Sequence, residues 1–96
     1  MVGRGARSKR RPYLVLTRNS AIGALHEVLV AAVTRTIRPI PTQVELDEGD
    51  GMPVPCAVNL DNLLMMPLGQ LTERVCDLSG ERMAAVCAAL DVATEC

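Results

Sequence analysis

A chain of 96 residues is long enough for one small domain. Apolar residues make up 49% of it and charged residues 22%, a mixture that excludes an intrinsically disordered chain. With one Tyr, no Phe and no Trp, the chain has no row of aromatic side chains on which nucleic-acid bases could stack.

The net charge of −1 conceals two parts of opposite sign. Residues 1–38 carry eight basic side chains and one acid, whereas residues 39–96 carry two basic side chains and ten acids. A cationic half favours a polyanionic partner such as nucleic acid. Arg18, Arg35 and Arg38 are the clearest candidates because they lie beside predicted strands. The alternative for residues 4–10 is a solvated basic tail.

Most of the chain is predicted to form short strands. Residues 28–34 are apolar throughout and rich in Val, which is typical of a central strand buried on both faces. Residues 20–27 fit either a loop or one helical turn. The acidic segment 47–55, rich in Gly and Pro, is predicted as a loop. The expected strands are 13–17, 28–34, 42–46, 56–60, 63–66 and 71–77, with a turn near Asp61 and Asn62 between the fourth and fifth.

The C-terminal segment is predicted to be a helix. Ser79 is a suitable N-cap, and Glu81 places negative charge in the first turn. Apolar residues then recur at helical spacing: Met83, Val86, Cys87, Leu90 and Ala93. The expected fold is therefore mainly β, a small curled antiparallel sheet or partial barrel with one C-terminal α-helix.

Cofactors and membranes are not expected. The four cysteines include no CxxC pair and His26 is the only histidine, so the sequence predicts no metal site, and no disulfide is expected either. The longest apolar run covers residues 28–33, far too short to cross a membrane. We expect a soluble, cytoplasmic protein. No hydrolase or phosphate-loop motif is present, and His26 is expected to play no catalytic part.

Several motifs occur in an order that resembles the MazF/PemK toxin family. They span about residues 11–93 and comprise RPYLVL (11–16), VLVAAVTRTIR (28–38), PTQVEL (41–46), DGMP (50–53), VNLDN (58–62) and ERM (81–83), the last followed by the apolar segment 86–90. The resemblance implies an SH3-like curled sheet with a terminal helix. It also implies a homodimer and a type II toxin–antitoxin system, with a MazE-like antitoxin as cognate partner.

The activity that the resemblance implies is sequence-specific, ribosome-independent and metal-independent cleavage of single-stranded RNA. The catalytic Arg of the family's RP motif corresponds to Arg11, and the catalytic Thr at the end of its central strand to Thr34. Asn62 corresponds to a position implicated in RNA contact. With the basic residues considered above, the expected RNA-binding set is Arg10, Arg18, Arg35, Thr36, Arg38 and Asn62.

One departure from the family concerns the N-terminus. Relatives open with a strand and a loop rich in Gly and Ser before the RP motif, whereas residues 1–10 here are basic and are not predicted to contain a strand. They are expected to form a flexible basic segment, with the toxin domain covering residues 11–96. This departure leaves open a catalytically degenerate homologue that still binds RNA. A second alternative is a CcdB-like gyrase poison without nuclease activity, because CcdB-type toxins share the implied architecture.

Overall fold

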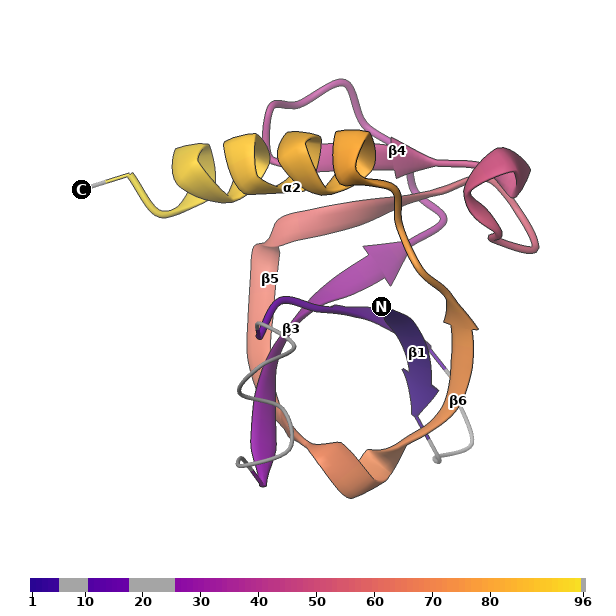
Figure 1. Cartoon of the computed structure of the whole chain (residues 1–96). Coiled ribbons are helices and arrows are strands. Elements are labelled where there is room, and N and C mark those ends of the chain that lie inside the picture. Colours follow the sequence, from indigo (N-terminus) through magenta and orange to yellow (C-terminus); the bar gives the residue numbers. More distant parts are fainter. Residues whose placement is uncertain (6–10, 18–25, 96) are drawn as a thin grey trace.

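The computed structural model describes residues 1–5, 11–17 and 26–95 (Figure 1). These residues form one antiparallel sheet of six strands, two short 3-10 helices and a C-terminal α-helix. The elements are β1 (Val2–Gly5), β2 (Pro12–Val15), β3 (Glu27–Thr34), β4 (Gln43–Leu46), η1 (Glu48–Asp50), β5 (Cys56–Pro67), η2 (Leu68–Gln70), β6 (Leu71–Cys76) and α2 (Gly80–Ala93).

The sheet curls into a half-barrel with the strand order β4-β5-β3-β2-β1-β6. In Figure 1 the lower part of the sheet nearly closes into a ring, with β3 and β5 on one side and β1 and β6 on the other, while α2 runs along β4 at the top. This architecture confirms the predicted curled antiparallel sheet with one helix.

Strand β3 is buried on both faces, as its apolar sequence predicts. Val28 and Val30 point to one face and Ala31 and Val33 to the other, because successive side chains of a strand alternate. The first face belongs to a small cluster with Val15 and Met66. The second belongs to the main core beneath α2, whose fully buried members include Leu14, Leu46, Leu60, Val58 and Val86.

The prediction of two strands joined by a turn near Asp61 is wrong. β5 is one continuous strand of 12 residues that bends instead of turning back. Ala31 of β3 pairs with Leu63 and the next residue, Ala32, pairs with Asn59, so the residues between them form a bulge. Asp and Asn suit bulges as well as turns, and only the pairing of both halves with β3 distinguishes the two.

The prediction that residues 1–10 contain no strand is also wrong. Val2–Gly5 form β1, which pairs with β2 on one edge and with β6 on the other. Val2 is fully buried in the main core. A strand with a single large apolar residue has no alternation to detect, and it is stabilised here by backbone pairing on both sides. The expectation of flexibility concerned residues 1–10, of which 6–10 lie outside the described residues.

Helix α2 begins as predicted. The Ser79 hydroxyl oxygen accepts a hydrogen bond from the Arg82 backbone N–H at 3.2 Å. Val86 and Ala89 are buried against the sheet, but Cys87 is exposed, so its assignment to the apolar stripe is wrong. The buried face of α2 runs instead through Val86 and Ala89, on the side where the helix packs on β4 and β5. No helix in the described part of the chain is long and apolar enough to span a membrane.

The acidic loop 47–55 contains η1 and ends it with Gly51 in the left-handed backbone region, at φ 98°. A side chain at this position would be strained. Its Cβ would also lie 2.7 Å from the Cβ of Cys76, far inside van der Waals contact. Gly51 therefore allows the loop to approach β6 closely.

We expect Gly51→Ala to lower the free energy of unfolding by about 2–4 kcal/mol, combining left-handed strain with overpacking. Urea unfolding followed by circular dichroism measures the change. Gly69→Ala is the matched control, because a Cβ at Gly69 meets nothing within 4 Å. Equal midpoints for the two variants would contradict this account of Gly51.

Candidate functional site

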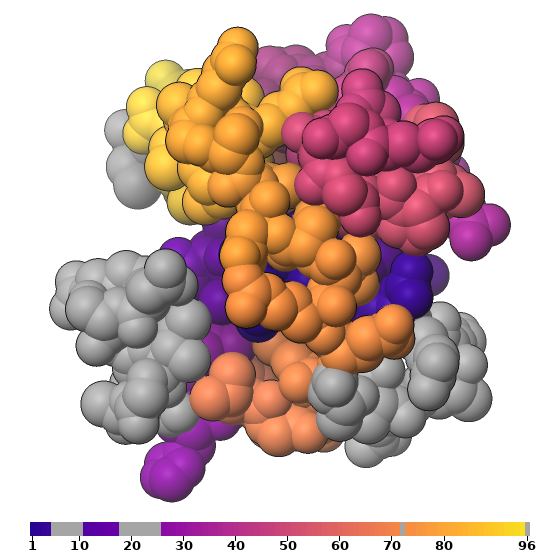
Figure 2. All heavy atoms as spheres, turned by 45° about the vertical axis from the view of Figure 1, so that its right-hand side comes forward, coloured from indigo at the N-terminus to yellow at the C-terminus, as the bar shows by residue number. Residues whose placement is uncertain are grey.

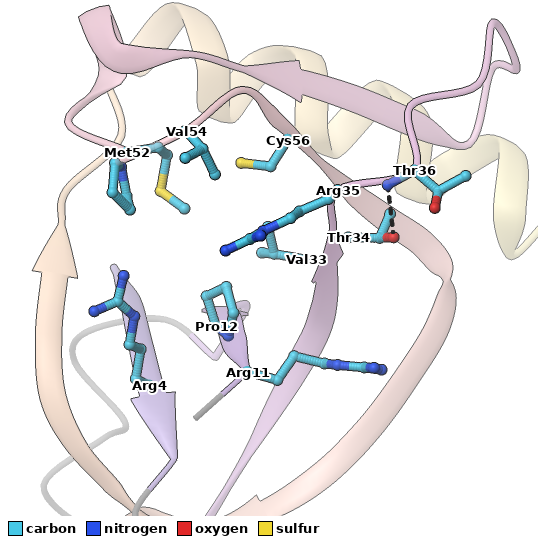
Figure 3. Close-up of a pocket in the computed structure, with 11 residues that line it drawn as sticks. Arg4, Arg11, Pro12, Val33, Thr34, Arg35, Thr36, Met52, Val54 and Cys56 are labelled. Carbon is cyan, nitrogen blue, oxygen red and sulfur yellow. Dashed lines mark hydrogen bonds between the residues drawn. The ribbon is translucent and has the colours of Figure 1, made fainter. Parts of the chain in front are cut away.

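A cavity of 560 Å³ opens beside the ends of β2 and β3 (Figure 3). This volume lies within the range of typical small-ligand sites. Its walls come from four parts of the chain: β1, the start of β2, the end of β3, and the segment between η1 and β5. The lining residues are Arg4, Arg11, Pro12, Val33, Thr34, Arg35, Thr36, Met52, Pro53, Val54 and Cys56.

Strand register brings Arg11 and Thr34 together, although they are far apart in sequence. β2 and β3 pair antiparallel with Tyr13 opposite Ala32. Continuing this register by two residues places Arg11 opposite Thr34, and both side chains line the cavity. The two residues that the family resemblance selects as catalytic therefore lie at one place on the sheet.

The Thr34 hydroxyl is held in a defined position. Its Oγ1 accepts a hydrogen bond from the backbone N–H of Thr36 at 3.1 Å, which leaves its own O–H free to donate. The Gln43 side chain holds the following turn, donating from Nε2 to the Thr36 carbonyl and accepting at Oε1 from the Arg38 N–H. This hydrogen-bonded turn fixes Thr34 at the edge of the cavity.

The cavity is strongly cationic. Among the described residues, three arginines, Arg4, Arg11 and Arg35, contribute to its lining, and no acid does. Within the described part of the chain, neither Arg11 nor Arg35 forms an ion pair. Figure 3 shows the Arg4 and Arg35 side chains facing the space below Met52, with Arg11 extending toward the side of Thr34. Such a surface suits an anion such as phosphate, which arginine binds through paired N–H donors.

Cys56 is the one sulfhydryl in the lining, and its surroundings keep it protonated. Burial raises the pKa of the Cys56 thiol, and the neighbouring Cys76 raises it further. A protonated, buried thiol is a poor nucleophile and a poor general base. The cavity therefore supplies positive charge and hydroxyl donors but no activated protein nucleophile at Cys56.

The other predicted RNA-binding residues fall in three groups. Arg35 and Thr36 line the cavity together with the predicted catalytic pair. Arg38 and Asn62 are exposed and do not line it. Arg10 and Arg18 lie outside the described residues. His26 is exposed, directly precedes β3 and is not among the lining residues either.

Arg4 was not predicted as a site residue, because its neighbours in the sequence indicate a possible basic tail. It lies on β1, opposite Pro12 of β2 and opposite Glu73 of β6. No sequence signal singles it out, because the strand that carries it has no recognisable pattern. In the apolar wall formed by Met52, Pro53 and Val54, the first two were identified only as part of a family motif, and Val54 was not identified at all.

An ion pair joins helix α2 to η1, the short helix that precedes the apolar wall of the cavity. Asp50 Oδ1 accepts from Arg82 Nε at 3.0 Å, and its Oδ2 accepts from the Asp47 backbone N–H at 2.9 Å. The hydrogen bond from Asp47 is the main cause that lowers the pKa of the Asp50 carboxyl, and Arg82 adds to it. Figure 2 shows the start of α2 and the η1 segment next to each other above β6.

Because the folded pKa of Asp50 is depressed, its stabilising effect is complete above the ordinary value of 3.8 and is lost as the pH falls through the folded pKa. We expect Asp50→Asn to lower stability at neutral pH by about 1 kcal/mol and to flatten the acid side of the stability curve. Thermal unfolding between pH 2 and pH 7 tests this. Asp91→Asn, at an exposed helix position, is the control and should keep the wild-type profile.

The chain is a small β protein with one packed helix and an arginine-lined cavity whose charge suits an anion. Comparison with known proteins defines it more closely. A family model described as "PemK-like, MazF-like toxin of type II toxin-antitoxin system" matches residues 2–94. The chain belongs to this family, as the motifs predicted.

Individual relatives agree with this assignment. The chain is 43% identical over 88 residues to the probable endoribonuclease MazF5 of Mycobacterium tuberculosis (strain ATCC 25618 / H37Rv), covering 91% of this chain and 81% of that protein. The solved structure of the Mycobacterium tuberculosis toxin MazF-mt6 superposes with a TM-score of 0.88 at 30% identity, covering 96% of this chain and 93% of that one.

A further solved structure is an endoribonuclease in complex with its cognate antitoxin from a mycobacterial species. Its TM-score is 0.85 at 25% identity, covering 96% of this chain and 88% of that one. The family match includes residues 2–5, which form β1, so the opening strand that sequence analysis did not find lies within the matched region.

Proposed function

We propose that this chain is the toxin of a type II toxin–antitoxin system and a sequence-specific, ribosome-independent and metal-independent endoribonuclease for single-stranded RNA. The observation that carries the proposal is the placement of Arg11 and Thr34 in one cavity with two further arginines and no lining acid. The endoribonuclease names of the relatives support it. Its action would stop translation and growth in the cytoplasm, where the RNA is.

The proposed reaction uses the RNA's own 2′-hydroxyl. Its oxygen loses its proton as it attacks the adjacent phosphorus, and the bond from phosphorus to the 5′ oxygen breaks. The products are a 2′,3′-cyclic phosphate and a 5′-hydroxyl, the leaving oxygen taking up a proton. Negative charge grows on the phosphate oxygens in the transition state, so donors placed there accelerate the reaction.

Arg11 and Thr34 have the proposed catalytic roles. Arg11 stabilises the transition-state charge with its fork of N–H donors. Arginine side chains stay protonated in proteins, so the role of general base is not assigned to it. Thr34 donates its free O–H to the same phosphate. The proposed RNA contacts are Arg35 and Thr36 in the cavity, Arg38 and Asn62 beyond its lining, and Arg10 and Arg18, which lie outside the described residues.

The proposed protein partner is a cognate MazE-like antitoxin. Its acidic, disordered segment would fold over the cationic surface and compete with RNA. The complex of a related endoribonuclease with its antitoxin supports this.

Saturating antitoxin should block cleavage, and a toxin that still cuts RNA at full rate in the complex would contradict the proposed position of the site.

We also propose a homodimer. The exposed apolar side chains of Ile37, Ile40, Met65 and Val92 would gain from burial in a chain whose own core is small. Analytical ultracentrifugation at micromolar concentration is expected to show a dimer. A stable monomer that retains cleavage activity would count against this assembly.

The deciding experiment incubates the purified protein with a long RNA in EDTA and analyses the product ends, with a gyrase supercoiling assay alongside. Cleavage at defined sequences in EDTA with cyclic phosphate ends supports the proposal. Gyrase inhibition without cleavage supports the CcdB-like alternative. RNA binding with neither effect supports a degenerate homologue.

A further inference from the structure

We infer that Arg4 forms an additional phosphate-binding position on the far wall of the cavity, and that Glu73 weakens this position in the free protein. The inference rests on the proposed function, because it assigns a second phosphate of the same RNA strand. Arg4 contributes to the same cavity as Arg11 and Arg35, although it comes from a different strand. The inferred ligand is the phosphate next to the one that is cleaved.

The candidate residues lie on three neighbouring strands. Thr34 ends β3, Arg11 precedes Pro12 of β2, and Arg4 of β1 lies directly opposite Pro12. Because adjacent side chains of a strand alternate, Arg4 and Pro12 lie on the face of the sheet opposite Arg11 and Thr34, and the cavity is lined from both faces at the end of β2 (Figure 3). Neighbouring strands are about 4.8 Å apart, so the backbone positions from β3 to β1 extend over roughly 10 Å. One phosphate does not cover that distance, whereas consecutive phosphates of a strand passing along the cavity do.

Arg4 has free hydrogen-bonding capacity for such a contact. It forms one ion pair in the described residues, a long one at 3.4 Å from its Nη1 to Glu73 Oε1. A guanidinium group has five N–H donors, so one long contact leaves most of them available. The Arg4 side chain is 28% exposed, which allows a ligand to reach it without unfolding β1.

Glu73 lies opposite Arg4 on the neighbouring strand β6. Its side chain is 47% exposed and does not line the cavity. The carboxylate therefore competes with phosphate for the guanidinium of Arg4 and repels the RNA strand beyond it. Removing the charge should strengthen RNA binding, and the gain should depend on Arg4.

The test measures binding of an uncleavable RNA oligonucleotide over a range of salt concentrations. The oligonucleotide contains a site that the wild type cleaves, with deoxyribose at the cleaved position. We expect Arg4→Ala to weaken binding about tenfold at low salt. We also expect it to reduce the slope of log K against log salt by about 0.7, the value for one phosphate of a single strand. Arg74→Ala is the matched control, because Arg74 is an exposed arginine of β6 that pairs with Asp77 outside the cavity.

A double-mutant cycle tests the role of Glu73. Glu73→Gln should tighten binding severalfold in the wild type but have little effect in the Arg4→Ala background. Glu45→Gln, the same change at an exposed position of β4, should have little effect in both. An equal gain from Glu73→Gln in both backgrounds would mean a general charge effect and would overturn the inferred competition.

The outcomes separate this inference from the proposed function. If the wild type cleaves RNA and Arg4→Ala binds it with unchanged affinity and salt slope, Arg4 is not a phosphate position and the proposed function still stands. If the wild type neither binds nor cleaves RNA, the proposed function fails and the inference fails with it.

If Arg4→Ala does not fold, the Arg4→Lys variant is measured instead. It should keep the salt slope but lose affinity, because lysine keeps the charge and lacks the fork.

Discussion

A single deoxyribose at the cleaved position is expected to abolish cleavage of an RNA oligonucleotide and to leave its affinity almost unchanged. The proposed nucleophile is the 2′-hydroxyl, and removing it leaves the phosphorus without an attacking group. The phosphate contacts to Arg11 and to the other cationic side chains remain, so binding persists. Gel analysis of products and a binding titration of the same oligonucleotide measure the two effects separately.

The control for this experiment is a deoxyribose placed one nucleotide away from the cleaved position. It removes a hydroxyl of the same kind without removing the nucleophile, and cleavage should continue. Persistent cutting at the deoxyribose itself would require an attacking water or protein group. The proposed roles of Arg11 and Thr34 would then have to be abandoned.

Arg11→Ala is expected to reduce the cleavage rate about a hundredfold or more, the usual effect of removing one donor to a developing oxyanion. The loss should appear in the rate of the bound RNA more than in its affinity, because the interaction strengthens in the transition state. Thr34→Val removes the hydroxyl and keeps the branched shape, and it should also slow cleavage. Single-turnover kinetics at saturating protein isolates the chemical step.

Arg38→Ala is the matched control for Arg11→Ala. Arg38 is an exposed arginine that lies outside the cavity lining. Its loss should weaken binding and lower the salt slope, with little change in the rate of the bound RNA. If both arginine variants lose only affinity, Arg11 is a binding residue and not a catalytic one.

The local structure of this chain was largely predictable from its sequence. The Val-rich segment of β3 predicts a central strand because apolar residues occupy both faces. Ser79 predicts the start of α2 because its hydroxyl satisfies a free backbone N–H there. The ordered motifs predict the family, and through it the two candidate catalytic residues, Arg11 and Thr34. All of these signals are contained in short stretches of neighbouring residues.

Only the tertiary structure decided which distant residues share a site. The pairing of β2 with β3 sets Arg11 opposite Thr34, and the pairing of β1 with β2 adds Arg4, which the sequence associates with a basic tail. Likewise β5 continues through Asp61 because both of its halves pair with β3. Strand pairing depends on the backbone N–H donor and C=O acceptor, which every residue except proline carries whatever its side chain. A short strand such as β1, with one buried valine, therefore leaves almost no trace in the sequence.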